Sequence, residues 1–436
     1  MPDVLAGLAV LAALGSAILA ARRLRRRVDA EWSRKIVHLT MGCVAMSFPF
    51  IFHHRGSVVV LGLCAIAALL ALRLNTRLRA GLGSSLFGVQ RQSLGEIYFT
   101  LSIVLVYLLH TSIAEYLAPL LVLTFADSAA ALVGCSYGRH ELAGEHEDRK
   151  SYEGSVMFFI TAFICVLTPL QLLTDVGRAE VLMISFMIGL LAAMVEMVSQ
   201  NGNDNLLLPL LVYSFLRYNM NQPMRTLLLN FAIMLCFLAA LICVYKLTAI
   251  SKLALAYALL TAYVILIQGG FLWILPPLLM FLTFRTLPLP RPEEKLSVVP
   301  WQIVDANAFV GLVCLWLAVF FPQMNALLYA AYSLSFACHL TLDTYHRFVN
   351  YLHMGRARAW ACGLGKALCF IAAPTYIAAH TTPRLAALYA AALVAVIPAA
   401  ALLRSRFNFA EINVRSARAN EALVACLVAL FIILAF

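Results

Sequence analysis

The sequence is poor in charged residues. Only 12% of its 436 residues are Asp, Glu, Lys or Arg, whereas 63% are hydrophobic. Ordinary soluble domains carry about 25% charged residues, so a water-soluble protein is excluded. Because a hydrocarbon core about 30 Å thick needs roughly 20 apolar residues per helix, the chain is predicted to be an all-α, polytopic transmembrane bundle of about 13 to 16 spans.

Acidic residues are scarcer than basic ones, with 21 Asp and Glu against 32 Lys and Arg. The basic residues stand in tight clusters between apolar runs, which is typical of loops on the cytoplasmic side. This pattern argues against nucleic acid as a partner. The first apolar run precedes the basic cluster at residues 22–27, the reverse of the order in a cleaved secretory signal. Residues 1–29 are therefore predicted to be an anchor helix with its N-terminus outside.

Two common cofactor motifs are also missing. The eleven Cys residues form no CxxC pair, and several of them, such as Cys165 and Cys314, lie inside apolar segments. This favours a packing role over zinc or redox chemistry. The polar loop at residues 134–154 contains no GxxxxGK[ST] string, so it is not a Walker P-loop.

The polar residues that are present form four islands in the first half of the chain. Tracing the basic loops places all four on one face, the cytoplasmic one. A change of composition near residues 246–252 then divides residues 30–246, the predicted catalytic membrane domain, from residues 247–436. The second part has fewer charges inside its apolar runs and is predicted to be a second membrane domain.

The first two islands stand at the beginnings of predicted helices. In the string RKIVH, residues 34–38, helical spacing puts Arg34, Lys35 and His38 on neighbouring positions of one face. That string is either a basic anchor with a packed His or the site of a reserve catalytic base, His38. In RQSLGEIYF, residues 91–99, Glu96 is either a carboxylate that stabilises a helix N-terminus or a metal ligand or base.

The third island combines Asp127, inside an apolar run, with a polar loop that begins at Gly134. An ionisable residue at membrane depth is a functional-site hypothesis by default. Backbone donors, a helix N-terminus and two cations follow Asp127 along the chain, and together they meet the requirements of a triphosphate site. The residues that supply them are Gly138, Arg139, Lys150, Ser151 and Gly154.

The fourth island contains Glu196, Asp204 and Asn205, followed by Pro209. Carboxylates with an amide oxygen suit magnesium, which keeps several waters and bridges phosphates. Asp204 has an alternative role as a helix cap.

In chain order, five strings resemble the dolichol kinase and phytol kinase family of CTP-dependent lipid kinases, with CDP-lipid cytidylyltransferases as more distant relatives. The strings are RKIVH, RQSLGE, ADSAAALVGCSYGRH, KSYEGS and EMVSQNGNDNLLLP, within about residues 30 to 215. The resemblance implies transfer of the γ-phosphate of CTP to a long-chain isoprenoid or related lipid alcohol. It also implies that the nucleotide and metal are surrounded by Asp127, Gly134, Gly138, Lys150, Ser151, Glu153, Gly154, Glu196, Asp204 and Asn205.

Each role in this resemblance has a physical reason, because phosphoryl transfer depends on positioning and charge neutralisation. Arg139 and Lys150 are expected to clamp phosphates, and Glu196 and Asp204 to hold Mg²⁺. Asp127 is expected to orient or deprotonate the lipid hydroxyl, with His38 and Glu96 as further catalytic candidates. The expected partners are the lipid alcohol, a nucleoside triphosphate and membrane lipids.

Two other functions stay open at this point. A cytidylyltransferase that attaches CMP to a lipid phosphate needs the same nucleotide and metal. In a transporter or membrane scaffold, Asp127 and Glu196 would instead line a solute path.

The second half is faintly similar to the phytyl-phosphate kinase family in three strings, QIVDANAFVG, LTLDTYH and ANEALVACLVALF. It lacks the Gly-rich polar stretch and the acidic residue that this family has after its Asp-Thr pair. Tyr345, His346 and Arg347 follow Asp343 and Thr344 instead. This half is expected to be degenerate or structural.

Overall fold

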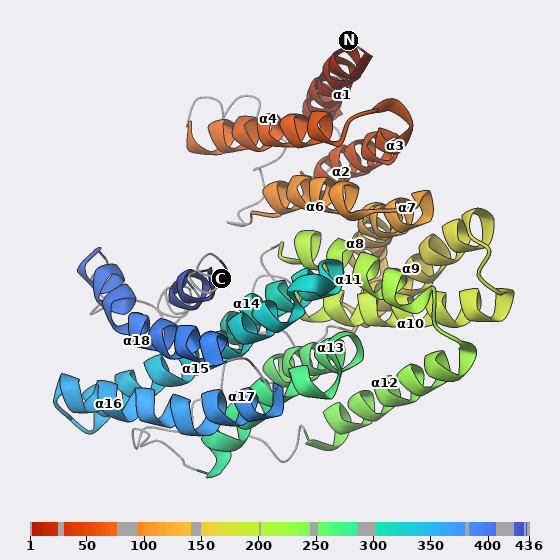
Figure 1. Cartoon of the computed structure of the whole chain (residues 1–436). Coiled ribbons are helices and arrows are strands. Elements are labelled where there is room, and N and C mark those ends of the chain that lie inside the picture. The colour runs from red at the N-terminus through yellow and green to blue at the C-terminus, as the bar shows by residue number, and fades with distance from the viewer. Residues whose placement is uncertain are drawn as a thin grey trace. The chain divides into compact units, whose positions relative to one another are not determined.

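The computed structural model describes residues 2–24, 30–75, 94–140, 150–199, 202–244, 252–286, 301–379, 383–406, 423–430 and 433. The regular elements of these residues are helices, which confirms the all-α prediction (Figure 1). Within the described residues, seven helical segments are long and apolar enough to cross a membrane: Arg55–Leu74, Ile113–Tyr137, Tyr152–Leu173, Arg178–Val198, Met224–Cys243, Leu253–Thr283 and Arg356–Ala379. Shorter apolar helices accompany them. The chain is thus a multi-pass membrane protein, and the number of spans stays a prediction.

The chain forms two compact units, Met1–Phe231 and Ala232–Phe436. The division falls inside α12 (Met224–Val244). The boundary predicted at residues 246 and 247 lies outside the described residues.

The first unit contains the four polar islands. Its elements before α12 are α1 (Pro2–Leu24), α2 (Ala30–Met46), α3 (Phe48–Ile51), α4 (Arg55–Leu74), α6 (Gly95–Leu109), α7 (Ile113–Leu121), η2 (Val122–Ala126), α8 (Asp127–Tyr137), α9 (Tyr152–Leu173), α10 (Arg178–Val198) and α11 (Asp204–Asn219). Helix α1 covers most of the predicted anchor and packs against α2 and α4.

The helices α9 and α10 form a close pair in this unit (Figure 1). Gly189 of α10 permits the approach, because a Cβ atom there would stand 3.1 Å from the main-chain nitrogen of Phe163 in α9. Phe158 and Ile188 are fully buried in the same region. Helix α8 packs on α9 as well, so α9 connects the third and fourth islands.

The segment Ile113–Tyr137, predicted as a span over residues 116–133, is not a uniform α-helix. Pro119 lacks the backbone N–H that an α-helix uses. The next residues, Val122–Ala126, adopt the wider π-helix η2, and α8 begins at Asp127. Short π segments of this kind frequently occur at functional sites.

Helices α6 and α11 are joined at both ends. Asn205 Nδ2 donates to the carbonyl oxygen of Gly95, 3.1 Å away, at their N-terminal ends. Tyr213 donates its hydroxyl hydrogen to the carbonyl oxygen of Leu109 over 2.7 Å further along. The two helices therefore run in the same direction, and α6 fixes the start of α11, where Asp204 lies.

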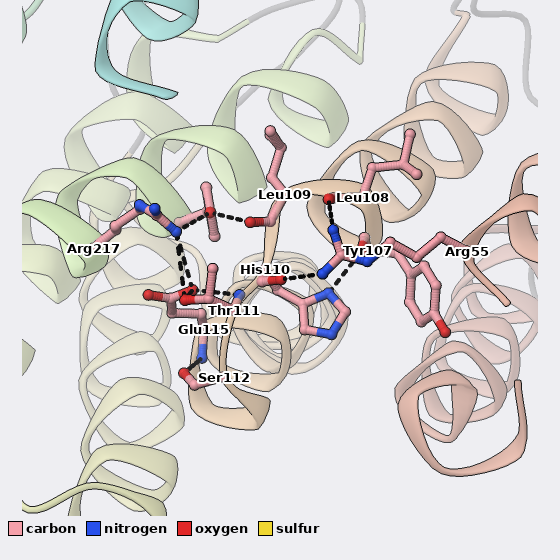
Figure 2. Close-up of polar contacts among 10 residues, drawn as sticks. Arg55, Tyr107, Leu108, Leu109, His110, Thr111, Ser112, Glu115 and Arg217 are labelled. Carbon is pink, nitrogen blue, oxygen red and sulfur yellow. Dashed lines mark hydrogen bonds and ion pairs between the residues drawn. The ribbon is translucent and has the colours of Figure 1, made fainter. Parts of the chain in front are cut away.

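A polar cluster secures the turn between α6 and α7. Arg55 and Arg217 approach this turn from opposite sides (Figure 2). Arg55 donates to two carbonyl oxygens at the C-terminal end of α6, over 2.9 and 3.1 Å. The buried Glu115 accepts from the backbone and hydroxyl of Thr111 and lies 3.6 Å from Arg217 Nη1. The turn is thereby tied to α4 and α11.

The second unit is built around one long helix, α15 (Asn325–Tyr351). It packs against α13 (Lys252–Thr286), α14 (Trp301–Phe320), α16 (Arg356–Ala367) and α18 (Pro383–Arg406). Further elements of this unit are η4 (Pro322–Met324), η5 (Leu368–Ala372) and α17 (Ala373–Ala379). Helix α13 is broken at Gly270, whose φ is 76°, where the Gly269-Gly270 pair predicts a break.

Candidate active site

Asp127 is held by Lys35, a residue 92 positions earlier in the chain. Lys35 Nζ donates to Asp127 Oδ2 over 2.6 Å and lies 3.3 Å from the main-chain oxygen of the same residue. The lysine side chain is only 3% exposed and that of Asp127 21%. A buried ammonium group without a partner is strongly unfavourable, so this ion pair accounts for both intramembrane charges.

His38 contacts the same segment one turn further along α2. Its Nε2 atom lies 3.0 Å from the carbonyl oxygen of Leu123, in the π-helix, and 3.5 Å from Asp127 Oδ2. A carbonyl oxygen only accepts, so Nε2 carries the hydrogen in this contact. The Phe99 ring packs 4.5 Å from the imidazole. With Nε2 as the donor, Nδ1 of the neutral ring is the acceptor, so His38 and Asp127 both stay candidates for a base.

A second lysine–carboxylate pair connects the third and fourth islands. Lys150 Nζ lies 2.9 Å from Glu196 Oε1 and also donates to the main-chain oxygen of Glu196. Both side chains are mostly buried, at 19% and 14% exposed. Lys150, expected at the phosphates, and Glu196, expected at the metal, are therefore in direct contact in this structure.

Asp204 lies at the first residue of α11, within electrostatic reach of both pairs. Removal of its carboxyl group from solvent raises the pKa of Asp204. Lys150 opposes that rise, the Asp127 carboxylate adds to it and Lys35 opposes it again. The backbone N–H of Asn205 donates to Asp204 Oδ1 over 3.0 Å. Three carboxylates and two ammonium groups thus share one region.

The predicted phosphate-loop glycines contact one another and the cap of α9. A Cβ atom at Gly154 would stand 3.1 Å from the carbonyl oxygen of Ala130 and 3.4 Å from Gly134 Cα. A Cβ atom at Gly138 would stand 2.8 Å from Ser151 Oγ. Ser151 caps α9 and accepts from the backbone N–H of Gly154 over 3.1 Å. In this structure these residues pack α8 against α9, and the Gly154 donor serves the helix cap.

The other predicted site residues that the structure describes are Arg139, Glu153 and Glu96. Arg139 is exposed just after α8. Glu153, in the first turn of α9, pairs with His140 Nδ1 at 2.8 Å. Glu96 lies in the first turn of α6, beside Gly95. Residues 91–93 and 141–149, which contain other parts of the predicted motifs, lie outside the described residues, as does the side chain of Arg34.

Lys35 is the residue that motif reasoning left out of the proposed site. Its spacing from His38 places it on the same helical face, but the basic-anchor interpretation accounts for a lysine there equally well. The π-helix has no sequence signal apart from Pro119, three residues before it. Only the fold shows that α2 contacts this segment.

No protein-family model matches the chain, and no solved structure matches it. A phytol kinase of Synechocystis sp. is 31% identical to it over 204 residues, which are 45% of this chain and 84% of the relative. The chain belongs to the phytol kinase family. Of the two kinase families that the motifs resemble, the match supports the phytol kinase family, and a specific relation to dolichol kinases stays a prediction.

The match to the phytol kinase covers only part of the chain. The matched residues are fewer than half of the chain, so the match leaves the larger part of the protein without a counterpart in this relative. The phytol kinase match therefore concerns fewer than half of the residues, and the activity of the whole chain is a matter for proposal.

Proposed function

We propose that the protein is a CTP-dependent kinase that phosphorylates a long-chain isoprenoid or related lipid alcohol at the cytoplasmic face of a membrane. The observation that carries this proposal is the meeting of Lys35–Asp127, Lys150–Glu196 and Asp204 in one region. Membership of the phytol kinase family supports the class of reaction and of acceptor. The preference for CTP rests on the motif resemblance.

The charge arrangement suits phosphoryl transfer, in which catalysis is mainly positioning and electrostatic stabilisation. Lys150 lies directly before the N-terminus of α9, whose dipole favours an anion. In the proposed reaction, the lipid hydroxyl oxygen forms a bond to the γ-phosphorus while the bond from that phosphorus to the β–γ bridging oxygen breaks. CDP leaves, and the hydroxyl proton passes to the Asp127 carboxylate.

Magnesium fits the acidic residues of this region. Among the residues that the structure describes, no group of three or more His, Cys, Asp or Glu side chains is arranged to hold a metal ion. Magnesium is commonly bound through only one or two carboxylates plus substrate phosphates, so Glu196 and Asp204 are sufficient. Asn205 uses its amide nitrogen as a donor to Gly95, so its amide oxygen is the atom suited to the metal. The bound ion would neutralise charge on the phosphates.

The test is transfer of radiolabel from CTP to lipid by the purified full chain. Phytol, geranylgeraniol, polyprenols and diacylglycerol are offered separately, with Mg²⁺ or with excess EDTA. We expect label from γ-labelled CTP in an isoprenoid alcohol, no label from α-labelled CTP and loss of transfer with EDTA. ATP and GTP in parallel reactions test the choice of nucleotide.

Three results would contradict the proposal in different ways. Label from α-labelled CTP in a lipid phosphate identifies a cytidylyltransferase. Transfer to diacylglycerol alone overturns the isoprenoid assignment. No transfer to any acceptor by folded protein leaves the transporter or scaffold alternative.

A further inference from the structure

The contact between α2 and the π-helix goes beyond helix packing. Lys35 and His38 lie one turn apart on α2, and each reaches a main-chain oxygen at or next to η2: that of Asp127 and that of Leu123. A π turn shifts carbonyl groups out of the regular i→i−4 ladder and so makes them available to side chains. Helix α2 supplies donors for this irregular backbone.

Packing on the same face of α2 makes the contact specific. Gly42 is one turn after His38, and a Cβ atom there would overlap the side chain of Thr124 in η2. The side chain of Thr124 therefore packs directly against the backbone of α2 at Gly42, where only glycine leaves the space. Lys35, His38 and Gly42 form one continuous surface against the π-helix, which leads directly into Asp127.

Lys35 binds two points of a single residue. One is the carboxylate of Asp127 and the other is its main-chain oxygen. A flexible ammonium group bound at both points restricts the side-chain torsion of Asp127 as well as the charge beside it. Asp204 interacts electrostatically with both members of this pair, and its carboxylate repels that of Asp127. Lys35 counteracts this repulsion.

We propose that Lys35 is the positioning residue for Asp127, which it holds as an oriented carboxylate toward the lipid hydroxyl. This inference rests on the proposed kinase function. It assigns to Lys35 a part in catalysis that acts through Asp127 and not through the nucleotide.

The experiment is a double-mutant cycle in the full chain with Lys35→Met, Asp127→Asn and the double variant. We expect Lys35→Met to lower kcat about 10²-fold, as a misplaced reacting group does, with KM for the nucleotide unchanged. The double variant should be no slower than Asp127→Asn alone, because residues that act as one unit are not additive. Lys35→Arg, which keeps the cation, should restore part of kcat.

Gly42→Ala is the matched structural control. It disturbs the same helix contact without removing a charge, so any decrease in its kcat should be in proportion to the decrease in its melting temperature. In the Gly42→Ala/Asp127→Asn double variant, the two fold-decreases in kcat should multiply. If Lys35→Met does not fold, Lys35→Gln keeps a donor at this position and takes its place in the cycle.

The possible failures are distinct. A folded wild-type protein without transfer activity overturns the kinase proposal and this inference with it. Active wild type with an unchanged kcat in Lys35→Met overturns the inference alone. Full multiplication of the Lys35 and Asp127 effects, or a raised nucleotide KM, also overturns it, since Lys35 would then act independently of Asp127.

Discussion

At the scale of single residues, the Lys150–Glu196 pair offers a direct test of the phosphate clamp. Both groups are mostly buried, and no other cation is within 4 Å of Glu196 among the described residues. Lys150→Met keeps the length of the side chain and removes its charge. We expect kcat/KM for the nucleotide to fall by about 10²- to 10³-fold, the usual effect of losing one donor to developing charge. Steady-state kinetics of label transfer measures this.

Arg178→Met is the control for the loss of one positive charge. Arg178 is exposed at the first residue of α10. Its replacement should leave the kinetics unchanged. Equal losses in the two variants would show that Lys150 acts through net charge and not through contact with phosphate.

Some of the candidate site residues can be predicted from the sequence alone, and others cannot. Asp127 and Glu196 were identified because a carboxylate in an apolar run needs a reason to be there. The ion-pair partners of these carboxylates are harder to predict, since Lys35 and Asp127 are far apart in sequence and meet only through the contact of α2 with η2. Assigning Lys150 to phosphate and Glu196 to metal gave no indication that they form an ion pair. A motif names residue types, whereas pairing depends on the fold.

At the scale of elements, the α8–α9 contact depends on small residues. Gly138 has φ −64°, which any residue adopts, so only space limits a substitution there. A Cβ atom would overlap the carbonyl oxygen of Gly134 and press on Ser151. We expect Gly138→Ala to reduce the free energy of unfolding by about 1 to 3 kcal/mol, as overpacking does. Thermal unfolding of the purified protein in detergent provides the comparison.

Gly56→Ala is the matched control, because a Cβ atom at Gly56 in α4 meets nothing within 4 Å. Its melting temperature should equal or exceed that of the wild type, since alanine favours helix. A similar loss of stability in both variants would mean that the close α8–α9 contact is not the cause.

A helix boundary can be predicted from the sequence where residues such as glycine favour a break in the backbone. The Gly269-Gly270 pair predicts the break in α13, and Gly270 has the positive φ that explains it. The π turn before Asp127 is not predicted from the sequence, because its residues also occur in ordinary α-helices and the side chains that contact it, His38 and Lys35, belong to another helix. The glycines of the third island are predicted to lie around the nucleotide, and that prediction stands. The structure adds that they let α8 and α9 pack closely, which composition does not predict.

At the scale of the whole molecule, the question is whether the second unit takes part in the reaction. Asp343 is a buried acidic residue of this unit, in α15, and Arg347 Nε donates to its Oδ2 over 2.8 Å, one turn further along the same helix. The Asp127 pair connects α2 with α8, and the Glu196 pair connects α10 with the residue before the N-cap of α9. The Asp343–Arg347 pair lies within α15, and a pair within one helix stabilises that helix. A structural role for this half stays a prediction.

We therefore expect Asp343→Asn, made in the full chain, to leave phosphoryl transfer within about twofold of wild type, because Asp343 belongs to the second unit and is not one of the residues of the proposed site. Asp127→Asn should lower kcat by about 10²- to 10⁴-fold, since it removes the proposed acid–base group. Both variants exchange one carboxylate for an amide, so they differ mainly in the unit that they alter. Gel filtration and thermal unfolding establish that each is folded before kcat is compared. A folded Asp343→Asn protein that is as inactive as Asp127→Asn would refute the assignment of catalysis to the first unit alone, because the two carboxylates would then serve one reaction.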